Sequence, residues 1–445
     1  MRLKSLVSSH DGFWYDYFED HPDSEVVAER IHRVAVESRF SRPDWNTLLT
    51  PLVVEADMIE DLSGRLAALR RIMAKCGRLL YGDDVEAFAA AAGFPQAACA
   101  ALHLPSADLF PVRWDVLETA EGWRAVELNA GGALGVFAFD AVQSVYDDIL
   151  ARQGLAGAET WPSLAAAVGR EMAALMDRYG TDRVAVVLDR TTAGTYAAIA
   201  AVVANSLADT LGVAVAVCDE EEAASLAAAA GAPLLAYQCC SIADRAVSPC
   251  RYAGYDAAVA RGAIVQAIDP ATDLLASKSV MAMTWRCVEQ GLLPQGETDL
   301  VRGLLPRTVF LSDAARRRAA AEREEWVLKT AFGHGGFEVR CGWETDADAW
   351  ASALETAALP LLQRRARAVD RDGIGMLPDG TLIHMSAPKL LGLFQLGDAY
   401  CGACARQSPH NGGVVSCGSG AALGVVRTVA APEPAQPLLA SEGAV

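Results

Sequence analysis

The sequence predicts a mixed α/β protein (fold class α/β, or α+β) that combines a parallel sheet with antiparallel hairpins. Between residues 160 and 270, short β-branched apolar runs alternate with alanine-rich helical stretches, as in a parallel sheet covered on both faces. Alternating polar and apolar residues flank short turns at 110–130 and 374–385, which is typical of hairpins. With 445 residues, 52% of them hydrophobic, the chain has room for two or three domains on one connected core.

The composition argues against several classes of partner. The formal net charge is −18, so a basic nucleic-acid surface is not expected, and an anionic membrane would repel the chain. The first residues lack the apolar core of a secretory signal, and no apolar run has the length of a transmembrane helix. The 11 cysteines are scattered, which favours reduced thiols. We therefore expect a cytoplasmic protein without nucleic-acid or membrane partners, and the oligomeric state stays open.

The remaining segments divide the chain further. Residues 1–105 are expected to form a mainly helical region, with apolar residues at steps of three and four in 54–79. The segment 160–270 is expected to be a Rossmann-like α/β unit. Its strand-to-helix turn at 189–195 lacks G-x-G-x-x-G, which disfavours a dinucleotide site and favours a role on the substrate side. Residues 429–445 are rich in proline and alanine and are expected to form a flexible tail.

The hairpin pattern PVRWDVLETAEGWRAVELNA carries four polar residues in the order R-x-D…E-x-N. Residues i and i+2 share a face of a strand, so Arg113 and Asp115 should point the same way from the first strand. Glu127 and Asn129 should likewise share a face of the second strand. The apolar residues between them, Val126 included, are expected on the opposite faces.

The register of this hairpin decides what the polar residues can do. A three-residue turn at 120–122, with glycine at the position that needs positive φ, sets Asp115 opposite Glu127 and Arg113 opposite Asn129. Opposed carboxylates repel each other unless a divalent cation lies between them, and oxygen ligands of this kind suit Mg²⁺ beside nucleotide phosphates. The alternative is a surface hairpin with scattered charges, and the pairing alone does not decide between the two.

Two of the chain's few lysines lie in segments with features of a phosphate site. Lys278 lies in an expected helix at 272–292, and Lys329 ends a strand that leads into a glycine loop. The loop contains Gly333, His334, Gly335 and Gly336. It lacks the G-K-[ST] of a P-loop, but a glycine loop between antiparallel strands can close over phosphates with backbone N–H groups. An ordinary hairpin with a nearby lysine is the alternative.

The C-terminal third adds a glutamine and an arginine. Gln363 lies in a short strand within 359–367, and Arg406 precedes a glycine- and serine-rich stretch. Cys401 and Cys404 form a single C-x-x-C without a second pair, so a zinc or redox site is not favoured.

In this order, the hairpin, the two lysines, the glycine loop, the glutamine and the late arginine resemble the circularly permuted ATP-grasp ligases, in particular the synthetase domain of glutathionylspermidine synthase. The resemblance covers the hairpin and most of 272–426. In an ordinary ATP-grasp enzyme the metal-binding carboxylates follow the nucleotide lysines, whereas here they come first. The resemblance implies a permuted ATP-grasp fold with a metal-binding hairpin and linker at 106–150, an inserted pre-ATP-grasp-like unit at 160–270, and an ATP-binding domain at 272–428.

The resemblance also implies roles for single residues. Asp115, Glu127 and Asn129 would hold Mg²⁺ ions that bridge the ATP phosphates. Arg113 and Arg406 would be catalytic, because they would stabilise charge on the transferred phosphoryl group or the acyl phosphate. The residues that would contact ATP are Lys278, Lys329, Gly333, His334, Gly335, Gly336 and Gln363, with Gln363 at the adenine hinge and His334 beside a phosphate or acting as a base.

The implied activity is an ATP- and Mg²⁺-dependent ligase that joins a carboxylate to an amine through an acyl phosphate. The sequence contains no G-x-S-x-G motif and no evident Ser/His/Asp set, so neither pattern favours a serine nucleophile instead. Asn129 is followed by Ala130-Gly131-Gly132, unlike the family pattern, and the acceptor residues do not match, so polyamine or glutathione is not implied. An amino acid, a peptide or a carrier-protein-bound acyl group would be the substrate. The alternatives are a catalytically inactive homologue that serves as a binding or scaffold protein, and a small-molecule kinase.

Overall fold

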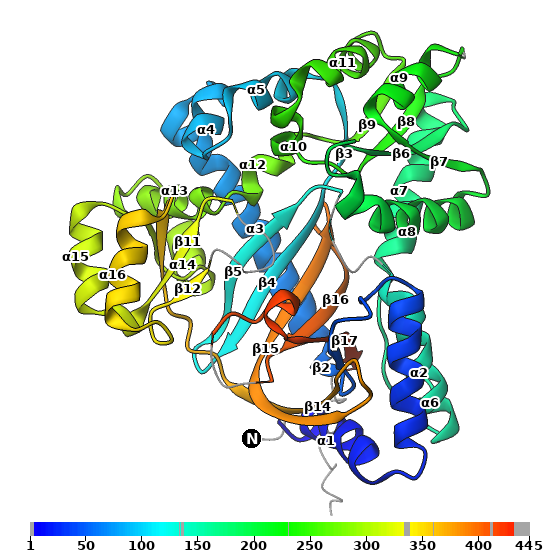
Figure 1. The fold of residues 1–445 in the computed structure, drawn as a ribbon, viewed down its shortest axis with the longest axis vertical. Coiled ribbons are helices and arrows are strands. Elements are labelled where there is room, and N and C mark those ends of the chain that lie inside the picture. Colours follow the sequence, from blue (N-terminus) through cyan, green and yellow to red (C-terminus); the bar gives the residue numbers. More distant parts are fainter. Residues whose placement is uncertain are drawn as a thin grey trace, which may run out of the picture.

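The computed structural model describes residues 4–132, 134, 138–229, 231–332, 339–358, 360–409 and 413–430 (Figure 1). These residues form a central eight-stranded sheet, a five-stranded parallel sheet and a four-stranded antiparallel sheet, together with their helices. In Figure 1 the parallel sheet lies above the central sheet, and the small sheet lies to its left. The mixed α/β fold class is confirmed. No helix in the described part of the chain is both long and apolar enough to cross a membrane.

The central sheet is assembled from widely separated parts of the chain. Its strands run in the order β14-β1-β17-β16-β15-β4-β5, and β2 pairs with β17. Their bounds are β1 Thr47–Leu48, β2 Leu52–Glu55, β4 Pro111–Thr119, β5 Gly122–Ala130, β14 Asp370–Met376, β15 Leu382–Leu396, β16 Ala399–Gln407 and β17 Ala422–Val429. All neighbours are antiparallel except β17 with β1 and β2. The region expected to be mainly helical thus also supplies two strands.

Helices from the first third of the chain cover both faces of this sheet. Their bounds are α1 Lys4–Asp20, α2 Ser24–Glu37, α3 Ala56–Tyr81, α4 Val85–Ala91, α5 Gln96–Cys99, the 3₁₀ helix η1 Ala100–His103 and α6 Phe139–Arg152. Helix α3 runs behind the sheet in Figure 1, whereas α2 and α6 lie side by side at its other flank. Trp114 of β4 is fully buried in the same core as α3, and Phe394 of β15 is buried in the core that includes α6. Because neighbours on a strand face opposite ways, Arg113 and Asp115 face away from α3.

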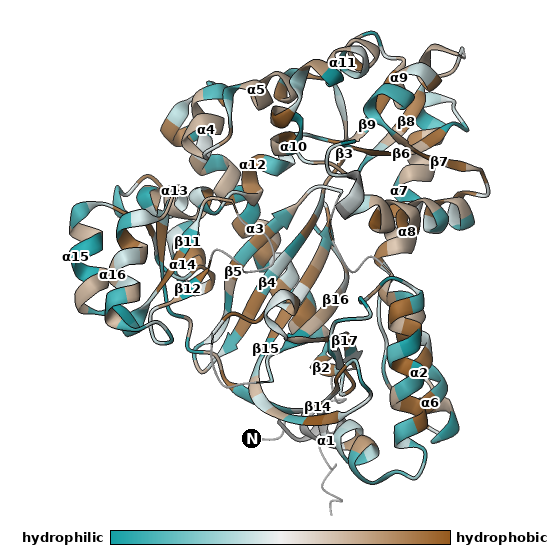
Figure 2. Cartoon of the chain, in the orientation of Figure 1, coloured by the Kyte–Doolittle hydropathy of each residue, from teal (hydrophilic) through white to brown (hydrophobic). Residues whose placement is uncertain are grey.

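The alternation that was read from the sequence is visible on the hairpin strands. In Figure 2, β4 and β5 change repeatedly between hydrophobic and hydrophilic residues along their length. Val112, Trp114, Val116 and Leu128 are buried in the core shared with α3, and the polar side chains Arg113, Asp115 and Glu127 lie on the other face. The second expected hairpin, at 374–385, is confirmed as well: it turns near Gly380, and Met376 of β14 lies opposite Leu382 of β15.

The five-stranded sheet is parallel throughout, as predicted for 160–270. Its order is β3-β9-β8-β6-β7, with β3 Ser106–Leu109, β6 Val184–Leu188, β7 Val215–Asp219, β8 Leu234–Gln238 and β9 Ile264–Ile268. Its helices are α7 Leu164–Tyr179, α8 Ala193–Leu211, α9 Glu220–Ala228, α10 Ile242–Val247, η2 Pro249–Tyr252 and α11 Ala253–Ala260. The predicted strands and the three long helices are present. The helices between β8 and β9 and the added strand β3 were not predicted.

The four-stranded sheet carries the second wall of the site. Its order is β10-β13-β11-β12, with β10 Thr308–Phe310, β11 Trp326–Thr330, β12 Arg340–Cys341 and β13 Pro360–Arg364. The helices and 3₁₀ turns around it and after it are α12 Thr272–Ala276, α13 Lys278–Glu289, α14 Gln295–Leu304, α15 Asp313–Ala321, η3 Arg323–Glu325, α16 Ala347–Thr356 and η4 Cys417–Ser419. The tryptophans Trp326 and Trp350 pack in a core of their own between this sheet and its outer helices.

The single helix expected at 272–292 is wrong, because the chain breaks it at Ser277. Ser277 has an extended backbone, and its side chain accepts a hydrogen bond from the backbone N–H of Ser279, as an N-cap does. A new helix, α13, therefore starts at Lys278. The break places this lysine at a helix terminus beside the hairpin instead of in the middle of a helix.

A buried ion-pair network ties β17 to the covering helices. Arg427 and Glu159 are fully buried, and the Arg427 Nε–Glu159 Oε2 distance is 2.5 Å. Arg427 also donates to Asp147 at 2.5 Å and to Gln143 Oε1 at 2.9 Å. The indole N–H of Trp14 donates to the other oxygen of Glu159 at 2.9 Å. Helices α1 and α6 are thereby attached to the central sheet through one guanidinium and one carboxylate.

Candidate functional site

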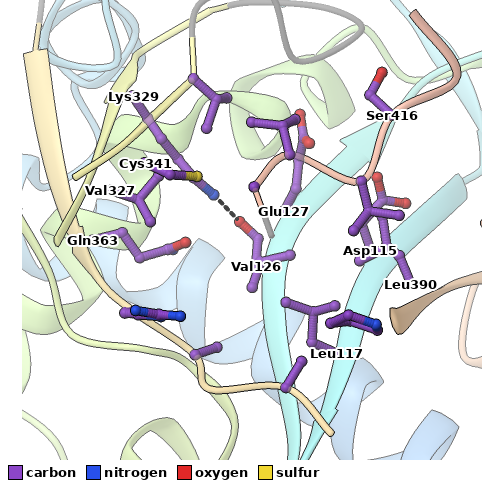
Figure 3. A pocket seen from close by; sticks show the side chains of 18 of the residues that line it. Asp115, Leu117, Val126, Glu127, Val327, Lys329, Cys341, Gln363, Leu390 and Ser416 are labelled. Atoms are coloured by element: carbon purple, nitrogen blue, oxygen red, sulfur yellow. Dashed lines mark hydrogen bonds between the residues drawn. The ribbon is translucent and has the colours of Figure 1, made fainter. Parts of the chain in front are cut away.

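A cavity of about 470 Å³ lies between the β4–β5 hairpin and the four-stranded sheet. This volume is within the range of small-molecule sites. Six of the predicted site residues line it: Arg113, Asp115, Glu127, Lys329, Gln363 and Arg406. Figure 3 shows Asp115 and Glu127 on one wall, with Lys329 and Gln363 across from them. Residues from three separate parts of the sequence therefore meet at one site.

The predicted register of the hairpin is confirmed: Asp115 lies opposite Glu127, and Arg113 opposite Asn129. Gly122 has a φ of 108°, as expected, although the turn itself contains only two residues between the paired Thr119 and Gly122.

One expectation about this hairpin is wrong, since Val126 does not face away from the site. The register shifts between Asp115 and Val116, so β5 has one extra residue at this point, which is a β-bulge. Val126 therefore lines the cavity together with Glu127. The bulge also turns the carbonyl oxygen of Val126 towards Lys329.

Asp115 is held by two arginines. Arg113 donates from Nε to Oδ1 at 2.8 Å and from Nη2 to Oδ2 at 3.3 Å, and Arg406 donates from Nη2 to Oδ1 at 3.0 Å. Asp115 is only 2% exposed. Burial by itself raises the pKa of Asp115, but the two guanidiniums outweigh it and the net pKa lies below the usual value. Asp115 stays ionised and fixes both arginines at the floor of the cavity.

Glu127 is paired with the first lysine. The Lys278 Nζ–Glu127 Oε1 distance is 2.8 Å, and Lys278 is almost completely buried. The backbone N–H of Lys278 donates to Ala331 O at 3.0 Å, so the start of α13 is bonded to the chain just after β11. The N-terminus of α13 and its lysine both place positive charge beside the hairpin.

Lys329 lies opposite the hairpin, at the end of β11. Its Nζ donates to Val126 O at 2.8 Å, which Figure 3 shows as a dashed line. Burial lowers the pKa of Lys329 to about 8, while Glu127 acts in the opposite direction. An anion in the cavity would raise this pKa towards its ordinary value.

Gln363 has a different environment from the one that was expected for an adenine contact. Its Nε2 donates to Thr308 Oγ1 at 3.1 Å and lies 3.7 Å from Met281 Sδ, so the amide nitrogen is bonded inside the small sheet. The amide oxygen points into the cavity (Figure 3). Gln363 can therefore offer an acceptor to a ligand, but its N–H group is already occupied.

Asn129 does not line the cavity, although it shares the strand face of Glu127. Its Nδ2 is buried without a hydrogen-bond partner among the described residues. The described residues contain no group of three or more His, Cys, Asp or Glu side chains placed to hold a metal ion. A metal held by Asp115, Glu127 and Asn129 would thus depend on further oxygen ligands from a nucleotide. Gly333, His334, Gly335 and Gly336 lie outside the described residues.

Three arginines that sequence reasoning missed form the rim of the cavity: Arg364, Arg365 and Arg367. The Arg365 guanidinium lies 4.0 Å from the ring centroid of Trp343, which also lines the cavity. The run QRRAR was the available signal, but the strand ending in Gln363 was interpreted without it. Across the cavity, residues 413–416 of the late glycine-rich stretch complete the wall.

The C-x-x-C cysteines behave as buried residues. Cys401 donates from Sγ to Ala399 O at 3.4 Å. Burial raises the pKa of Cys404, although the nearby Arg406 and Arg113 act in the opposite direction. Both thiols are free and buried, so neither is placed as a nucleophile.

The fold has a counterpart of known structure. No family model and no curated protein sequence matches the chain. The chain is similar in structure to a glutathione synthetase-like effector of Globodera pallida in its apo form, with a TM-score of 0.62 and 12% identity over 91% of this chain and 96% of that one. A Methylobacillus flagellatus protein, provisionally described as a gamma-glutamylcysteine synthetase, aligns over 82% of this chain and 87% of its own with a TM-score of 0.37 and 11% identity, which supports no conclusion. The first likeness shows a shared glutathione synthetase-like fold and leaves the activity to be argued from the site.

Proposed function

We propose that the protein is an ATP-dependent carboxylate–amine ligase of the circularly permuted ATP-grasp type, which forms an amide bond through an acyl phosphate. The observation that carries this proposal is the charge arrangement of one cavity. Four basic side chains, Arg113, Arg406, Lys278 and Lys329, surround two carboxylates, so the floor of the cavity has a net positive charge. This net charge is complementary to a magnesium–nucleotide triphosphate complex, which is negatively charged.

The residues fit ATP better than they fit a metal ion alone. Each carboxylate already has a basic partner: Asp115 has two guanidiniums and Glu127 has Lys278. Phosphate oxygens would compete for these cations, and the carboxylates released would become available to Mg²⁺. Glu127 and the side-chain oxygen of Asn129 would hold the ion, which would neutralise phosphate charge when bound. For Asp115 to join them, Arg113 or Arg406 must turn to a phosphoryl oxygen.

The proposed reaction has two steps, and neither needs a protein nucleophile. A carboxylate oxygen of the substrate attacks the γ-phosphorus of ATP, and the bond to ADP breaks. The nitrogen of the amine then attacks the acyl carbon, phosphate leaves, and the amine loses a proton. Arg113 and Arg406, fixed by Asp115, would stabilise charge on the transferred phosphoryl group, while Lys278 and Lys329 would position the other phosphates. Small-molecule acids and amines, an amino acid or a peptide among them, are the proposed substrates.

The direct test is product analysis. Full-length protein is incubated with ATP, Mg²⁺ and pools of carboxylates and amines, and ADP, phosphate and coupled products are measured. The ligase is expected to release ADP and phosphate together with a product whose mass is the sum of acid and amine less water. A phosphorylated product without coupling would indicate the kinase, and ATP binding without turnover for any pool would indicate the inactive binding protein.

Lys329→Ala is expected to weaken Mg·ATP binding by about tenfold to a hundredfold, because one hydrogen bond from a charged donor is lost. Isothermal titration calorimetry at fixed Mg²⁺ measures the effect. The control is Lys75→Ala, which removes a lysine paired with Glu297 at 2.8 Å, outside the cavity. Equal affinities of wild type and Lys329→Ala would remove this lysine from the nucleotide site.

The depressed pKa of Lys329 also predicts a pH dependence. In the free protein this lysine loses its proton near pH 8, and a bound phosphate would raise its pKa. Binding that needs the charged lysine is therefore strongest below pH 8 and weakens as pH rises through 8, by up to about tenfold per unit. ATP affinity measured between about pH 7 and 9.5 tests this. In Lys329→Arg, whose guanidinium stays charged, the affinity should change little over the same range.

A further inference from the structure

A second, much smaller cavity lies at the carboxyl end of the parallel sheet, where β8 and β9 end. Its volume is about 20 Å³, enough for one water-sized group. Gly131 and Gly132, which directly follow β5, form one side, and Gln238 and Asp273 form the other. The crevice beyond the carboxyl ends of parallel strands is where open α/β sheets bind ligands.

This small cavity continues the polar face of the hairpin. Glu127 and Asn129 share a face of β5, and Gly131, with a φ of 97°, directly follows the strand. Asp273 lies over Gly131: a Cβ added to Gly131 would be 2.8 Å from Asp273 Oδ1. At roughly 3.3 Å per residue, Asp273 is about 7 Å along the strand from Asn129 and about 13 Å from Glu127. Helix α12, which carries Asp273, packs against β5.

The carboxylates around this cavity are bonded only to neutral donors among the described residues. Asp273 Oδ2 accepts the backbone N–H of Ile242 at 2.7 Å, and no described donor reaches its Oδ1. Asp244 accepts from the N–H and hydroxyl groups of Ser241 at 2.8 and 2.9 Å. Asp269 accepts from the backbone N–H of Ala271 at 2.8 Å. These carboxylates thus receive no hydrogen bond from a cationic side chain, although Arg245 also lines the cavity.

The nearest basic group is committed elsewhere. Arg245 donates to Asp256, and its guanidinium lies 4.3 Å from the ring centroid of Tyr252. Burial raises the pKa of Asp273 to about 7; Asp244 adds to the effect, and the Ile242 N–H and the charge of Arg245 oppose it. A positive group beside Oδ1 would stabilise the ionised form of Asp273 and lower its pKa.

Two further polar groups, one in the cavity and one next to it, have no hydrogen bond of normal geometry among the described residues. Gln238 lines the cavity and is 8% exposed, and its Oε1 accepts the Ile268 N–H at 3.2 Å, which fixes the orientation of the amide. Its Nε2 then has no acceptor at hydrogen-bond distance among the described residues. The buried Tyr255 hydroxyl does not line the cavity but lies close enough to interact with Gln238, and it too lacks a hydrogen bond of normal geometry in the described part of the chain. Buried polar groups are rarely left unpaired, which indicates that a ligand or a water completes them.

We propose that this cavity binds a substrate ammonium group that is remote from the bond being formed. Asp273 Oδ1 accepts from the ammonium group, and Gln238 Nε2 donates to an oxygen next to it, as in the amino end of an amino acid or short peptide. The other end of the substrate lies along the β5 face, with its reacting group near Glu127. The proposal rests on the proposed ligase function for the identity of the reacting end, but the ammonium subsite itself can be tested without ATP.

The separation of the two sites sets the length of the substrate. An ammonium group at Asp273 and a reacting group near Glu127 are about 13 Å apart, which corresponds to a chain of about four residues. A single α-amino acid is too short to occupy both positions. The same ammonium group can belong to the acid substrate or to a diamine acceptor, and the probes below distinguish these two sources.

The test compares matched ligands with and without an amino group on the full-length protein in the absence of ATP. The probes are 6-aminohexanoate against hexanoate, triglycine against its N-acetyl form, and 1,6-diaminohexane against hexylamine, measured by calorimetry or ligand-observed NMR. We expect at least one amino-bearing probe to bind about tenfold or more tightly than its partner. Preference within the acid pairs assigns the subsite to the acid, and preference within the diamine pair assigns it to the acceptor. No preference in any pair overturns the proposal.

Asp273→Asn supplies the matched variant, because asparagine keeps the shape and can still accept from Ile242. The preference for the amino-bearing probe is expected to disappear, with ATP affinity unchanged. The control Asp209→Asn, on the exposed side of α8, should keep the preference. If Asp273→Asn does not fold, wild-type protein gives the answer by competition: methylammonium should displace the probe, and tetramethylammonium, too large for the cavity, should not. A preference that survives in folded Asp273→Asn, or equal competition by the two ions, contradicts the assignment.

These outcomes are independent of the proposed reaction. If the ammonium preference depends on Asp273 but no pool yields a coupled product, the subsite stands and the ligase proposal fails. If coupling occurs and the preference is absent, the ligase proposal stands and the subsite proposal fails.

Discussion

Asp115→Asn is expected to lower ATP-dependent coupling by about 10³-fold or more, the effect of losing a well-placed charge-stabilising group. The reason is that Asp115 holds two guanidiniums at once, at 2.8 Å from Arg113 and 3.0 Å from Arg406. Asparagine has one acceptor oxygen and an N–H₂ group that would face these donors. Both arginines would lose their fixed positions, and the site would lose a carboxylate. Release of ADP in the presence of a coupled substrate pair measures the change.

The matched control for this substitution lines the same cavity. Asp370 is exposed at the rim, and Asp370→Asn changes charge by the same amount without touching the arginine pair. Its activity should stay within about threefold of wild type. Circular dichroism must show that Asp115→Asn is folded, since a buried pair is altered. Wild-type turnover in folded Asp115→Asn would remove the hairpin from the mechanism.

Arg427→Met should reduce the free energy of unfolding by about 3–5 kcal/mol, the cost of leaving one member of a buried ion pair uncompensated. Glu159 would lose the guanidinium that neutralises it, and Asp147 and Gln143 would lose the donor that links them to β17. Urea denaturation followed by tryptophan fluorescence and circular dichroism measures the loss.

An exposed ion pair of similar length provides the comparison. Arg30 and Asp148 are 2.6 Å apart, with side-chain exposures of 34% and 53%. Arg30→Met should cost less than about 1 kcal/mol, because water solvates the remaining carboxylate. The double variant Arg427→Met with Glu159→Gln should recover part of the lost stability. Equal losses for Arg427→Met and Arg30→Met would show that burial does not govern the Arg427 network.

The hairpin shows which part of the site the sequence could predict. Strand alternation and one glycine at positive φ were enough to place Asp115 opposite Glu127, because both rules act over a few residues. The bulge at Val126 was not predicted, because the alternation of polar and apolar residues carries no sign of one extra residue in β5. Without the bulge Val126 would face α3, and its carbonyl would not reach Lys329.

The pairing of charges was harder to foresee. Arg113, Asp115 and Arg406 were each singled out, but their mutual ion pairs depend on β15 lying between β4 and β16, a long-range arrangement. Lys278 was placed on a helix, whereas its position at a helix start follows from the break at Ser277. The acidic cavity at Asp273 gave no signal, because its members come from the segments after β5, β8 and β9, which meet only in the folded protein.

The course of the chain through the central sheet has a consequence for biosynthesis. β17, which ends at Val429, lies between β1 and β16, and it also pairs with β2 near the start of the chain. During translation, β1 and β2 are synthesised long before β17, the strand with which both pair. Contacts between residues far apart in the sequence therefore form last. Until then the edges of β1, β2 and β16 are unpaired and able to associate with other chains. A nascent chain that stalls before residue 422 would expose these edges until β17 is added.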